Sequence, residues 1–339
     1  DYGVDLKGKR VAVIGTGASA AQFVPHIAPD VAQLDVYQRT PNWFVPVPHY
    51  HADMPQGLHW LLTHVPHYTH WYRFWTFWIT TDGLLPAATV NDDWPHKDRS
   101  ISAENDALRM LLEGYIRAQF ADRPDLLEKV VPPYPPAAKR IILDNGVWAT
   151  ALKRPNVSLV TERIERITPD GIVTADGVER PADVIIYGTG FTASRFLAPM
   201  TVRGRGGVDI NEQWGGDARA YLGVVVPNFP NFFMLYGPNT NIVVNGSIIY
   251  FSECEVQYVM GCLRMVLEGK RRALDCRRDV HDAYNARIDA ANAKRAWGAS
   301  GVNSWYKNAR GRVSQNWPFN VIEYWQQTRE PNPSDFEFL

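Results

Sequence analysis

The sequence predicts an α/β protein built around a Rossmann-type nucleotide-binding domain. Three observations indicate this fold class. Residues 11–14 form a short apolar run typical of a buried parallel strand, and a helical pattern opens at Ala18 after a glycine turn. A second apolar run, residues 34–37, follows at the distance that closes a βαβ unit of roughly 30 residues.

The break between this strand and helix has the pattern of a dinucleotide-binding turn. Gly15 allows a tight turn, and Gly17 lets backbone N–H groups approach a pyrophosphate. Ala20 stands where a third glycine often occurs, and the N-terminus of the following helix faces the phosphates. A lone G-x-G-x-x-A segment is weak evidence, but the flanking strand and helix make it specific. We therefore expect dinucleotide binding here.

The end of the second strand indicates which dinucleotide binds. An NAD site usually carries Asp or Glu there, which accepts hydrogen bonds from the ribose 2′-OH. Here Arg39 follows the strand, and its guanidinium offers a fixed fork of donors to a 2′-phosphate. Asp35 is the nearest carboxylate, but it lies inside the strand. NADP(H) is favoured, with an ordinary surface role for Arg39 as the alternative.

Composition bounds the remaining possibilities. The 339 residues, 45% of them hydrophobic, can bury one large core or two modest ones. The formal net charge of −1 gives no indication of a nucleic-acid or anionic-membrane partner. Cys254, Cys262 and Cys276 lack metal-ligand or CxxC spacing and are interpreted as reduced thiols of a cytoplasmic protein. No apolar run approaches the ~20 residues of a membrane span.

Between residues 43 and 136 the βαβ rhythm disappears. This region is rich in Trp, Tyr, Phe, His and Pro, and its apolar residues have helical spacing. We expect a helical insertion over residues 43–136, with its clearest helices at 59–78 and 102–120. Ser102, Asn105 or Asp106 could cap the second of these helices. The nucleotide-binding domain would then comprise residues 1–42 and 137–187.

Two side-chain sets in the insertion invite other hypotheses. The histidines at 64, 67 and 70 have helical spacing, but Pro66 interrupts them and no carboxylate joins them, so we expect no metal site. An aromatic stripe could face a membrane, pack against its own domain or line a substrate pocket. We favour packing. The stripe consists of Trp71, Phe74, Trp75 and Trp78.

After the insertion the α/β pattern returns, and the composition becomes mixed beyond residue 191. Strands are predicted at 140–143, 157–160, 183–187, 222–226 and 232–236, with a hairpin of 163–168 and 171–174. Helices are predicted at 147–153, 252–268 and 279–296, a loop at 237–241 and a mobile loop at 298–317.

These motifs, in this order, resemble the single-component Baeyer–Villiger monooxygenases that use FAD and NADPH, and most of all the branch that includes 4-hydroxyacetophenone monooxygenase. The resemblance runs from Asp5 to about Asp335. It implies a flavoprotein with two dinucleotide-binding domains, in which residues 188–339 form the C-terminal part of the FAD-binding domain. The motifs that carry it are GTGASAAQ at 15–22, YQRT at 37–40, KR at 139–140, DVIIYGTGF at 183–191, GPNTN at 237–241, SWYKN at 304–308 and NWP at 316–318.

The resemblance also implies roles for individual residues. It places the pyrophosphate of NADPH at the glycine turn, the 2′-phosphate at Arg39, Thr40 and Lys139, and a closing tryptophan at Trp305. The segment after the strand 183–187 would link the NADPH domain back to the flavin domain. The implied cofactor-binding residues are Gly15, Thr16, Gly17, Ala18, Ser19, Ala20, Gln22, Arg39, Thr40, Lys139, Gly188, Thr189, Gly190, Phe191, Asn239 and Trp305.

Arg140 matches the arginine that the family regards as catalytic. The implied reaction inserts one oxygen atom from O₂ into a ketone to give an ester or lactone. Anionic charge develops beside the ketone, and a guanidinium stays protonated and stabilises that charge. The alternative for Lys139 and Arg140 is an ordinary surface pair. Other readings of the whole chain are a flavin N- or S-monooxygenase and, in a different class, a non-catalytic NADP-binding subunit.

The sequence departs from the family in one respect. The family's FAD-binding βαβ unit with its own G-x-G-x-x-G, and its F-x-G-x-x-x-H-x-x-x-W sequence, do not occur in these 339 residues. We therefore expect this chain to be a C-terminal half. We further expect it to fold against a separate N-terminal FAD-binding polypeptide of roughly 150–200 residues, a typical domain length.

Overall fold

The computed structural model describes residues 3–339, which divide into two compact units. Of the described residues, the first unit comprises 3–53, 107–136 and 140–191, and the second comprises 54–106, 137–139 and 192–339. Two of these divisions, after Asp53 and after Asp106, fall inside the region predicted to be one helical insertion.

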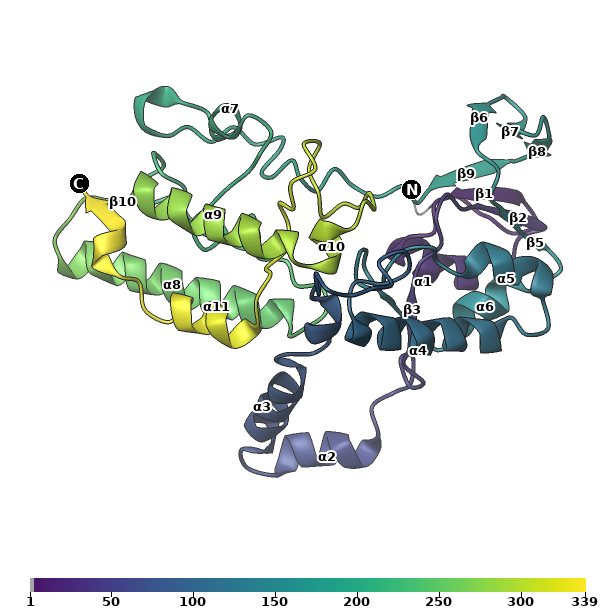
Figure 1. The fold of residues 1–339 in the computed structure, drawn as a ribbon, viewed down its shortest axis with the longest axis horizontal. Coiled ribbons are helices and arrows are strands. Elements are labelled where there is room, and N and C mark those ends of the chain that lie inside the picture. Colours follow the sequence, from purple (N-terminus) through teal and green to yellow (C-terminus); the bar gives the residue numbers. More distant parts are fainter. Residues whose placement is uncertain (1–2) are drawn as a thin grey trace. The chain divides into compact units, whose positions relative to one another are not determined.

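A four-stranded parallel sheet forms the centre of the first unit (Figure 1). The strand order β5-β2-β1-β9 places β1 between its βαβ partner β2 and the much later β9. The strands are β1 (Arg10–Ile14), β2 (Gln33–Tyr37), β5 (Val157–Val160) and β9 (Val184–Tyr187). All four predicted strands are confirmed, because buried parallel strands leave near-continuous apolar runs in a sequence.

Both faces of this sheet are covered within the first unit. Helices α1 (Ala18–Ile27) and α6 (Val147–Leu152) contact each other, and Figure 1 shows them on one face. On the other face, Ala12 and Tyr37 cluster with Ile172 of an antiparallel sheet. That sheet contains β6 (Ile164–Ile167), β7 (Gly171–Thr174) and β8 (Glu179–Pro181), so the predicted hairpin is confirmed and gains a third strand.

The first unit also contains a short parallel pair, β3 (Phe44–Pro46) with β4 (Ile142–Asp144), and the helix α5 (Pro124–Val130). The helix α4 (Ala103–Gln119) confirms the helix predicted at 102–120. Ser102 caps it, because its Oγ accepts a hydrogen bond of 3.1 Å from the backbone N–H of Asn105. Strand β4 begins two residues later than predicted, which leaves Arg140 just before it.

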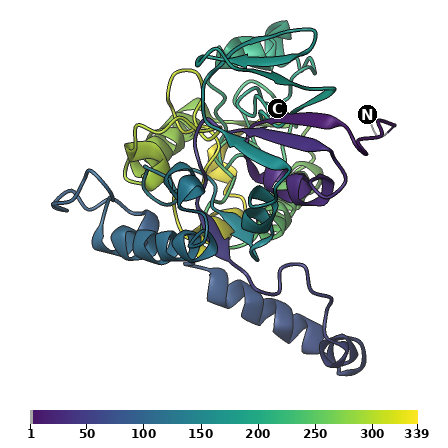
Figure 2. The same ribbon diagram turned by 90° about the vertical axis from the view of Figure 1, so that its right-hand side faces the viewer.

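The single helix predicted over residues 59–78 is wrong. Two helices occupy this stretch, α2 (Gln56–His64) and α3 (Tyr68–Thr80), joined by a short turn (Figure 1, Figure 2). Pro66 cannot donate a helical hydrogen bond, and His67 has a left-handed backbone with φ of 61°. The chain therefore turns between the helices.

The predicted packing of the aromatic stripe is also wrong. Neither α2 nor α3 buries any of its side chains, and Trp71 and Trp78 are 58% and 55% exposed. Another face of α3 contacts the rest of the second unit, where the rings of Phe77 and Tyr250 lie 4.2 Å apart. The stripe thus lies on a different face of the helix from its supporting contact.

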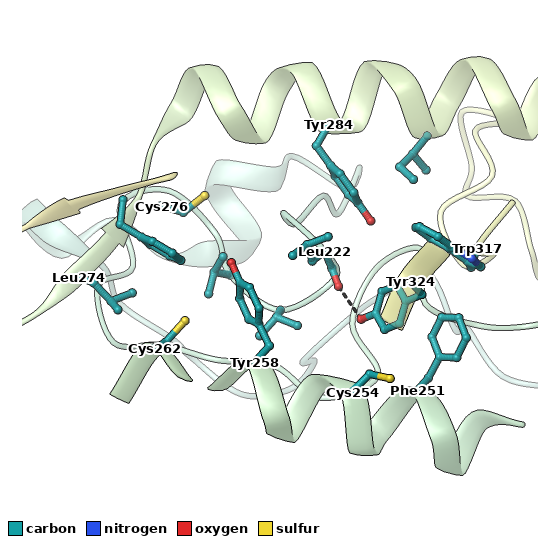
Figure 3. Close-up of a cluster of buried hydrophobic side chains, with 14 of the residues drawn as sticks. Leu222, Phe251, Cys254, Tyr258, Cys262, Leu274, Cys276, Tyr284, Trp317 and Tyr324 are labelled. Atoms are coloured by element: carbon teal, nitrogen blue, oxygen red, sulfur yellow. Dashed lines mark hydrogen bonds between the residues drawn. The ribbon is translucent and has the colours of Figure 1, made fainter. Parts of the chain in front are cut away.

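Helices α8 (Ile248–Glu268) and α9 (Arg278–Ala293) enclose the main core of the second unit (Figure 3). Tyr324 lies between them, and its hydroxyl donates a 2.8 Å hydrogen bond to the carbonyl of Leu222. The three cysteines are buried and free. The other elements are η1 (Pro86–Ala88), η2 (Arg205–Gly207), α7 (Ile210–Trp214), β10 (Leu274–Cys276), α10 (Ala296–Ala299), α11 (Val321–Thr328), η3 (Pro333–Asp335) and β11 (Phe336–Phe338).

The strands predicted at 222–226 and 232–236 are not formed. The first run makes a turn with one isolated bridge between Tyr221 and Val225, and Leu222 and Gly223 have positive φ. A short buried apolar run has the same composition in a strand and in a packed turn, so the pattern could not separate them. Among the helices of residues 3–339, none has the length and apolar character needed to cross a bilayer.

Candidate nucleotide-binding site

The predicted glycine turn lies where the strand order of the first unit reverses. In parallel register, Ile14 of β1 pairs with Tyr37 on one side and Tyr187 on the other. Segments 15–17 and 188–190 therefore leave the same carboxyl edge of the sheet side by side. Ligands of open parallel sheets bind in the crevice at such a switch point. The unit's geometry thus points to this edge.

Any residue other than glycine at position 15 would require the surrounding backbone to move. Its φ is 108°, and an added Cβ would lie 2.4 Å from the carbonyl oxygen of Gly188. The backbones after β1 and β9 are packed against each other here. No α-helix follows the G-T-G sequence after β9 before α7, so it is not a second strand–turn–helix site.

The N-terminus of α1 is open to a ligand. Gly17 is its N-cap, no side chain caps it, and a Cβ added to Gly17 would meet nothing within 4 Å. Its first backbone N–H groups therefore keep the polarity that attracts a phosphate. Of the predicted contact residues on this turn, Ser19 and Gln22 are exposed, whereas Thr16 and Ala20 are buried.

Asn42 supports the turn, and sequence reasoning missed it. Its Nδ2 donates to the carbonyl oxygen of Thr16 at 2.6 Å, which fixes the middle residue of the glycine turn. The two residues are 26 positions apart, and no local pattern joins them. The only feature of the sequence that could have indicated Asn42 is its position directly after residues 39–41, next to the predicted cofactor site.

Arg39 is exposed at the end of β2, as predicted. Within residues 3–339 no carboxylate forms an ion pair with it. Its neighbour Gln38 is buried and donates to the carbonyl of Lys129 at 2.6 Å, and Asp35 is buried and accepts from Gln33. The end of β2 therefore presents the guanidinium of Arg39. The nearby carboxylate, Asp35, is buried and already hydrogen-bonded to Gln33, so it is not available to a ribose hydroxyl.

The two cations of the Lys139-Arg140 pair fall in different units. Arg140 belongs to the first unit, where it is exposed two residues before β4. Lys139 belongs to the second unit and is half-buried. Thr40 is half-buried, and Thr189, Gly190 and Phe191 are exposed beyond β9 in the first unit.

The predicted loop at 237–241 is held by side chains of the second unit. Asn239 is 1% exposed, and its Nδ2 donates to the carbonyls of Val313 at 2.8 Å and Asn316 at 3.2 Å. Its Oδ1 accepts from Arg312 at 2.9 Å. Every polar atom of this side chain is thus used within the protein, and the backbone N–H groups of Asn239 and Asn241 also donate to the carbonyls of Ser314 and Gln315.

Arg312 connects this loop to two carboxylates. Its guanidinium lies 2.7 Å from Asp289 and 3.3 Å from Asp217, and the side chain is 11% exposed. Arg219 pairs with the same two carboxylates, at 2.8 and 3.1 Å. Two arginines and two aspartates therefore form a half-buried network beside the loop.

A buried carboxyl group supports the start of the same loop. Glu255 of α8 is 0% exposed, and its Oε2 accepts from the backbone N–H of Tyr236 at 2.9 Å. Burial raises the pKa of Glu255 to about 7, although the hydrogen bonds from Tyr236 and Tyr324 oppose that shift. Nothing in the sequence singled out this glutamate, because the spacing of α8 gives only its helical face.

Trp305 lies in the segment predicted to be a mobile loop. It is 39% exposed and its ring lies 4.6 Å from that of Tyr306, which is buried. Lys307 Nζ donates to the carbonyl of Ser300 at 2.7 Å, so the segment has internal contacts. Within residues 3–339, no three His, Cys, Asp or Glu side chains converge as a metal site.

Comparison with known proteins places these features in context. No protein-family model matches the chain. An uncharacterized monooxygenase of Sinorhizobium fredii, y4iD, is 40% identical over 340 residues, which cover 100% of this chain and 51% of that protein. A Baeyer–Villiger monooxygenase of Pseudomonas aeruginosa is 34% identical over 337 residues, covering 99% of this chain and 61% of that protein.

Among solved structures, an oxidized steroid monooxygenase bound to NADP superposes with a TM-score of 0.77 at 26% identity. The match covers 100% of this chain and 68% of that one, and it confirms the predicted fold class. The curated relatives are single polypeptides of which this chain spans 51% and 61%, so the prediction of a separate N-terminal FAD-binding polypeptide in a heteromer lacks support. Over its whole length, the chain is similar to part of flavin-dependent monooxygenases, among them Baeyer–Villiger monooxygenases.

Proposed function

We propose that this chain carries the NADPH-binding domain and the C-terminal part of the FAD-binding domain of a Baeyer–Villiger monooxygenase, within the branch that includes 4-hydroxyacetophenone monooxygenase. The reaction would insert one oxygen atom from O₂ into a ketone to give an ester or lactone. The observation that carries the proposal is the open glycine turn at the β1–β9 switch point, beside an unpaired Arg39, in a chain related over its whole length to such enzymes.

The residues of the first unit fit NADPH. The open N-terminus of α1 and the space around Gly17 suit a pyrophosphate, and Asn42 holds Thr16 in the required backbone position. Arg39 would donate to the 2′-phosphate, with Thr40 and Lys139 as the further ligands that the resemblance implies. A carboxylate in place of Arg39 would repel that phosphate, so the site favours NADPH over NADH.

Arg140 is the residue that we assign to the chemistry. Bound NADPH and FAD would supply the reducing equivalents and the activation of O₂. The guanidinium of Arg140 would then stabilise anionic charge that develops on the ketone oxygen, without changing its own protonation. Its position directly before β4 fixes its backbone, while its side chain remains exposed and free to orient. Loop 237–241, which contains Asn239 and is held by Arg312 and Glu255, would belong to the flavin-binding part, as the resemblance implies.

The test uses the flavin-loaded protein with NADPH and either a ketone, 4-hydroxyacetophenone, or a sulfide, thioanisole. We expect ester formation, which Arg140→Ala lowers in kcat by on the order of 10²–10³-fold while NADPH binding persists. Arg140→Lys should restore little activity, because an ammonium does not reproduce the planar fork. Arg166→Ala, which removes an exposed arginine of β6, is the matched control and should retain activity.

Each result discriminates among the readings of the chain. Oxidation of the sulfide without ester formation would replace the proposal with an S-monooxygenase. NADPH binding with no turnover of either compound would favour a non-catalytic NADP-binding role. Unchanged ester formation by Arg140→Ala would remove Arg140 from the mechanism and leave the family assignment in place.

A further inference from the structure

Helices α2 and α3 carry an apolar surface that nothing in the described structure covers. Their exposed aromatic side chains recur on α3 at i, i+3, i+4 and i+7, which places them on one face of the helix. We call this face the tryptophan stripe: Trp71 (58% exposed), Phe74 (48%), Trp75 (49%) and Trp78 (55%). Its rings contact one another, with Trp71–Phe74 and Phe74–Trp78 centroids 5.6 and 5.9 Å apart.

The stripe is held outward by contacts on another face of α3. Arg73 pairs with Glu253 of α8, and Phe77 packs on Tyr250. The backbone N–H of Gly246 donates to the carbonyl of Thr80 at 2.8 Å, which fixes the end of the helix. These contacts lie within the second unit and leave the stripe facing away from it.

The indole N–H groups of the stripe differ from those of five other tryptophans. Five tryptophans donate this group to the protein, to Tyr134, Ser100, Arg219, Asn292 and Asn320; the donors are Trp43, Trp94, Trp214, Trp297 and Trp317. Within residues 3–339, no acceptor is paired with the indole of Trp71, Trp75 or Trp78. An apolar ring with a free polar edge suits a surface that is apolar on one side and hydrated on the other.

The charge of the helix pair selects among possible partners. Residues 54–81 contain no Asp or Glu and four histidines, at 59, 64, 67 and 70, and their one arginine, Arg73, is already paired with Glu253. No carboxylate of this segment would therefore repel a layer of phosphate groups. By contrast, the helix α8 also exposes apolar residues but carries Glu253 and Glu268, which would repel phosphate groups.

The area of the stripe itself is small for self-association. Its four rings, each about half exposed, offer roughly 400 Å², to which Trp60, Tyr72 and Ile79 of the same helix pair add further exposed apolar surface. A stable protein–protein interface needs about 800 Å² from each partner. Insertion into a lipid headgroup layer has no such requirement, because tryptophan-bearing helices bind there through shallow burial of a single face.

We propose that α2 and α3 dock this protein on a phospholipid surface, with the tryptophan stripe inserted at the level of the headgroups. The helix pair is an in-plane anchor, which agrees with the lack of a membrane-spanning helix in residues 3–339. The near-neutral net charge that argued against a membrane partner describes the whole chain, whereas docking depends on this local surface. An apolar ketone dissolved in the lipid would then be close to the enzyme.

Vesicle flotation of the full chain tests the proposal, with vesicles of phosphatidylcholine and a minority of phosphatidylglycerol. The stripe variant replaces Trp71, Trp75 and Trp78 with Ser, and all three are exposed, so folding should be retained, which circular dichroism checks. The matched control replaces Ile249, Met260 and Leu267 of α8 with Ser, three apolar side chains that are 68%, 57% and 76% exposed.

We expect the wild-type chain and the α8 variant to float with the vesicles and the stripe variant to lose affinity by about tenfold or more. Three results would overturn the proposal. The first is absence of flotation of the wild-type chain, and the second is an equal loss in both variants. The third is a dimer, seen by sedimentation velocity without vesicle binding, that the stripe variant dissociates; a second copy would then be the partner.

Discussion

The two loops assigned to the cofactors are held in different ways. In the first unit, the glycine turn is fixed by backbone: parallel strands bring Gly15 against Gly188, and a Cβ would lie 2.4 Å from the neighbouring carbonyl. In the second unit, the loop 237–241 is fixed by side chains from α8, α9 and the segment 312–316. The first arrangement is encoded locally, and the second depends on residues far apart in the sequence.

The difference predicts which changes each loop tolerates. A backbone-held turn is sensitive to added volume at its glycines and indifferent to most surface charges. A side-chain-held loop is sensitive to the loss of one charged group, because its partners remain buried without compensation. Four substitutions test this contrast, and their expected effects on stability or cofactor binding decrease in the order given.

The largest effect is expected in the second unit. Arg312→Met removes the cation that joins Asn239, Asp217 and Asp289, and it should lower the free energy of unfolding by about 3–5 kcal/mol. Urea unfolding measures this loss. Arg310→Met is the control, since exposed Arg310 only donates to the carbonyl of Gly215, and its effect should stay below about 1 kcal/mol. Equal effects would mean that Arg219 alone compensates the two carboxylates.

The next effect tests the backbone-held turn. Gly15→Ala places a methyl group against Gly188 at a positive φ, and we expect a destabilisation of roughly 2–4 kcal/mol together with loss of NADPH binding. Calorimetric titration and thermal unfolding measure both quantities. Gly17→Ala has open space at its Cβ and a negative φ, so its stability should be nearly unchanged. If Gly15→Ala were as stable as Gly17→Ala, the close approach of the two strands would not constrain the turn.

The features that could be predicted from the sequence are those encoded locally, as in the backbone-held turn. Strands β1, β2, β5 and β9 and the turn at Gly15 were predictable because apolar runs and glycines at fixed spacing are local signals. The turn at 222–226 was not, since burial of Leu222 and Val224 comes from packing against α8 and α9 rather than from a sheet. A short apolar run carries no information about its partner.

The site shows the same limit. Arg39 could be found from its place after β2, while Asn42 and Arg312 act through contacts with residues 26 and 73 positions away. The two helices α2 and α3 illustrate the reverse error. Their apolar spacing predicts a packed face, and spacing alone does not tell whether the face packs on the protein or on another surface.

The third prediction concerns the pH dependence of the side-chain-held loop. Because the folded protein raises the pKa of Glu255 to about 7, the folded state retains a proton that the unfolded chain has already lost above its ordinary pKa of 4.5. Stability contributed by this group is present at low pH and is lost as the pH rises toward 7. Glu255→Gln mimics the protonated form, so between pH 5 and pH 8 its stability relative to wild type should improve by about 2–3 kcal/mol.

Denaturant unfolding at several pH values measures this change. Tyr324→Phe removes a hydroxyl that donates to the carbonyl of Leu222 and lies 3.3 Å from Oε1 of Glu255, but it keeps the carboxyl group. It should lower stability and still lose stability as the pH rises, with the loss extending to higher pH because the hydrogen bond from Tyr324 opposes the rise in the pKa of Glu255. A constant difference between Glu255→Gln and wild type across this pH range would show that the carboxyl group ionises normally.

The smallest effect is expected for a surface charge of the backbone-held site. Arg39→Ala should leave the free energy of unfolding unchanged, because the exposed guanidinium has no ion-pair partner within residues 3–339. It should weaken NADPH binding by about 1.5–3 kcal/mol, the value of a hydrogen bond to a charged group, and leave NADH binding nearly unchanged. Thr40 and Lys139 would retain part of the attraction for the phosphate.

Titration of both cofactors against wild type and Arg39→Ala separates this role from a structural one. Arg163→Ala, which removes another arginine of the first unit at the start of β6, is the control and should alter neither affinity. A stronger salt dependence for NADPH than for NADH is expected in the wild type and should diminish in the variant, because exposed charges are screened by ions. Equal loss of both cofactors in Arg39→Ala would mean that Arg39 holds the end of β2 rather than the 2′-phosphate. The preference for NADPH would then have to come from Lys139 or Thr40.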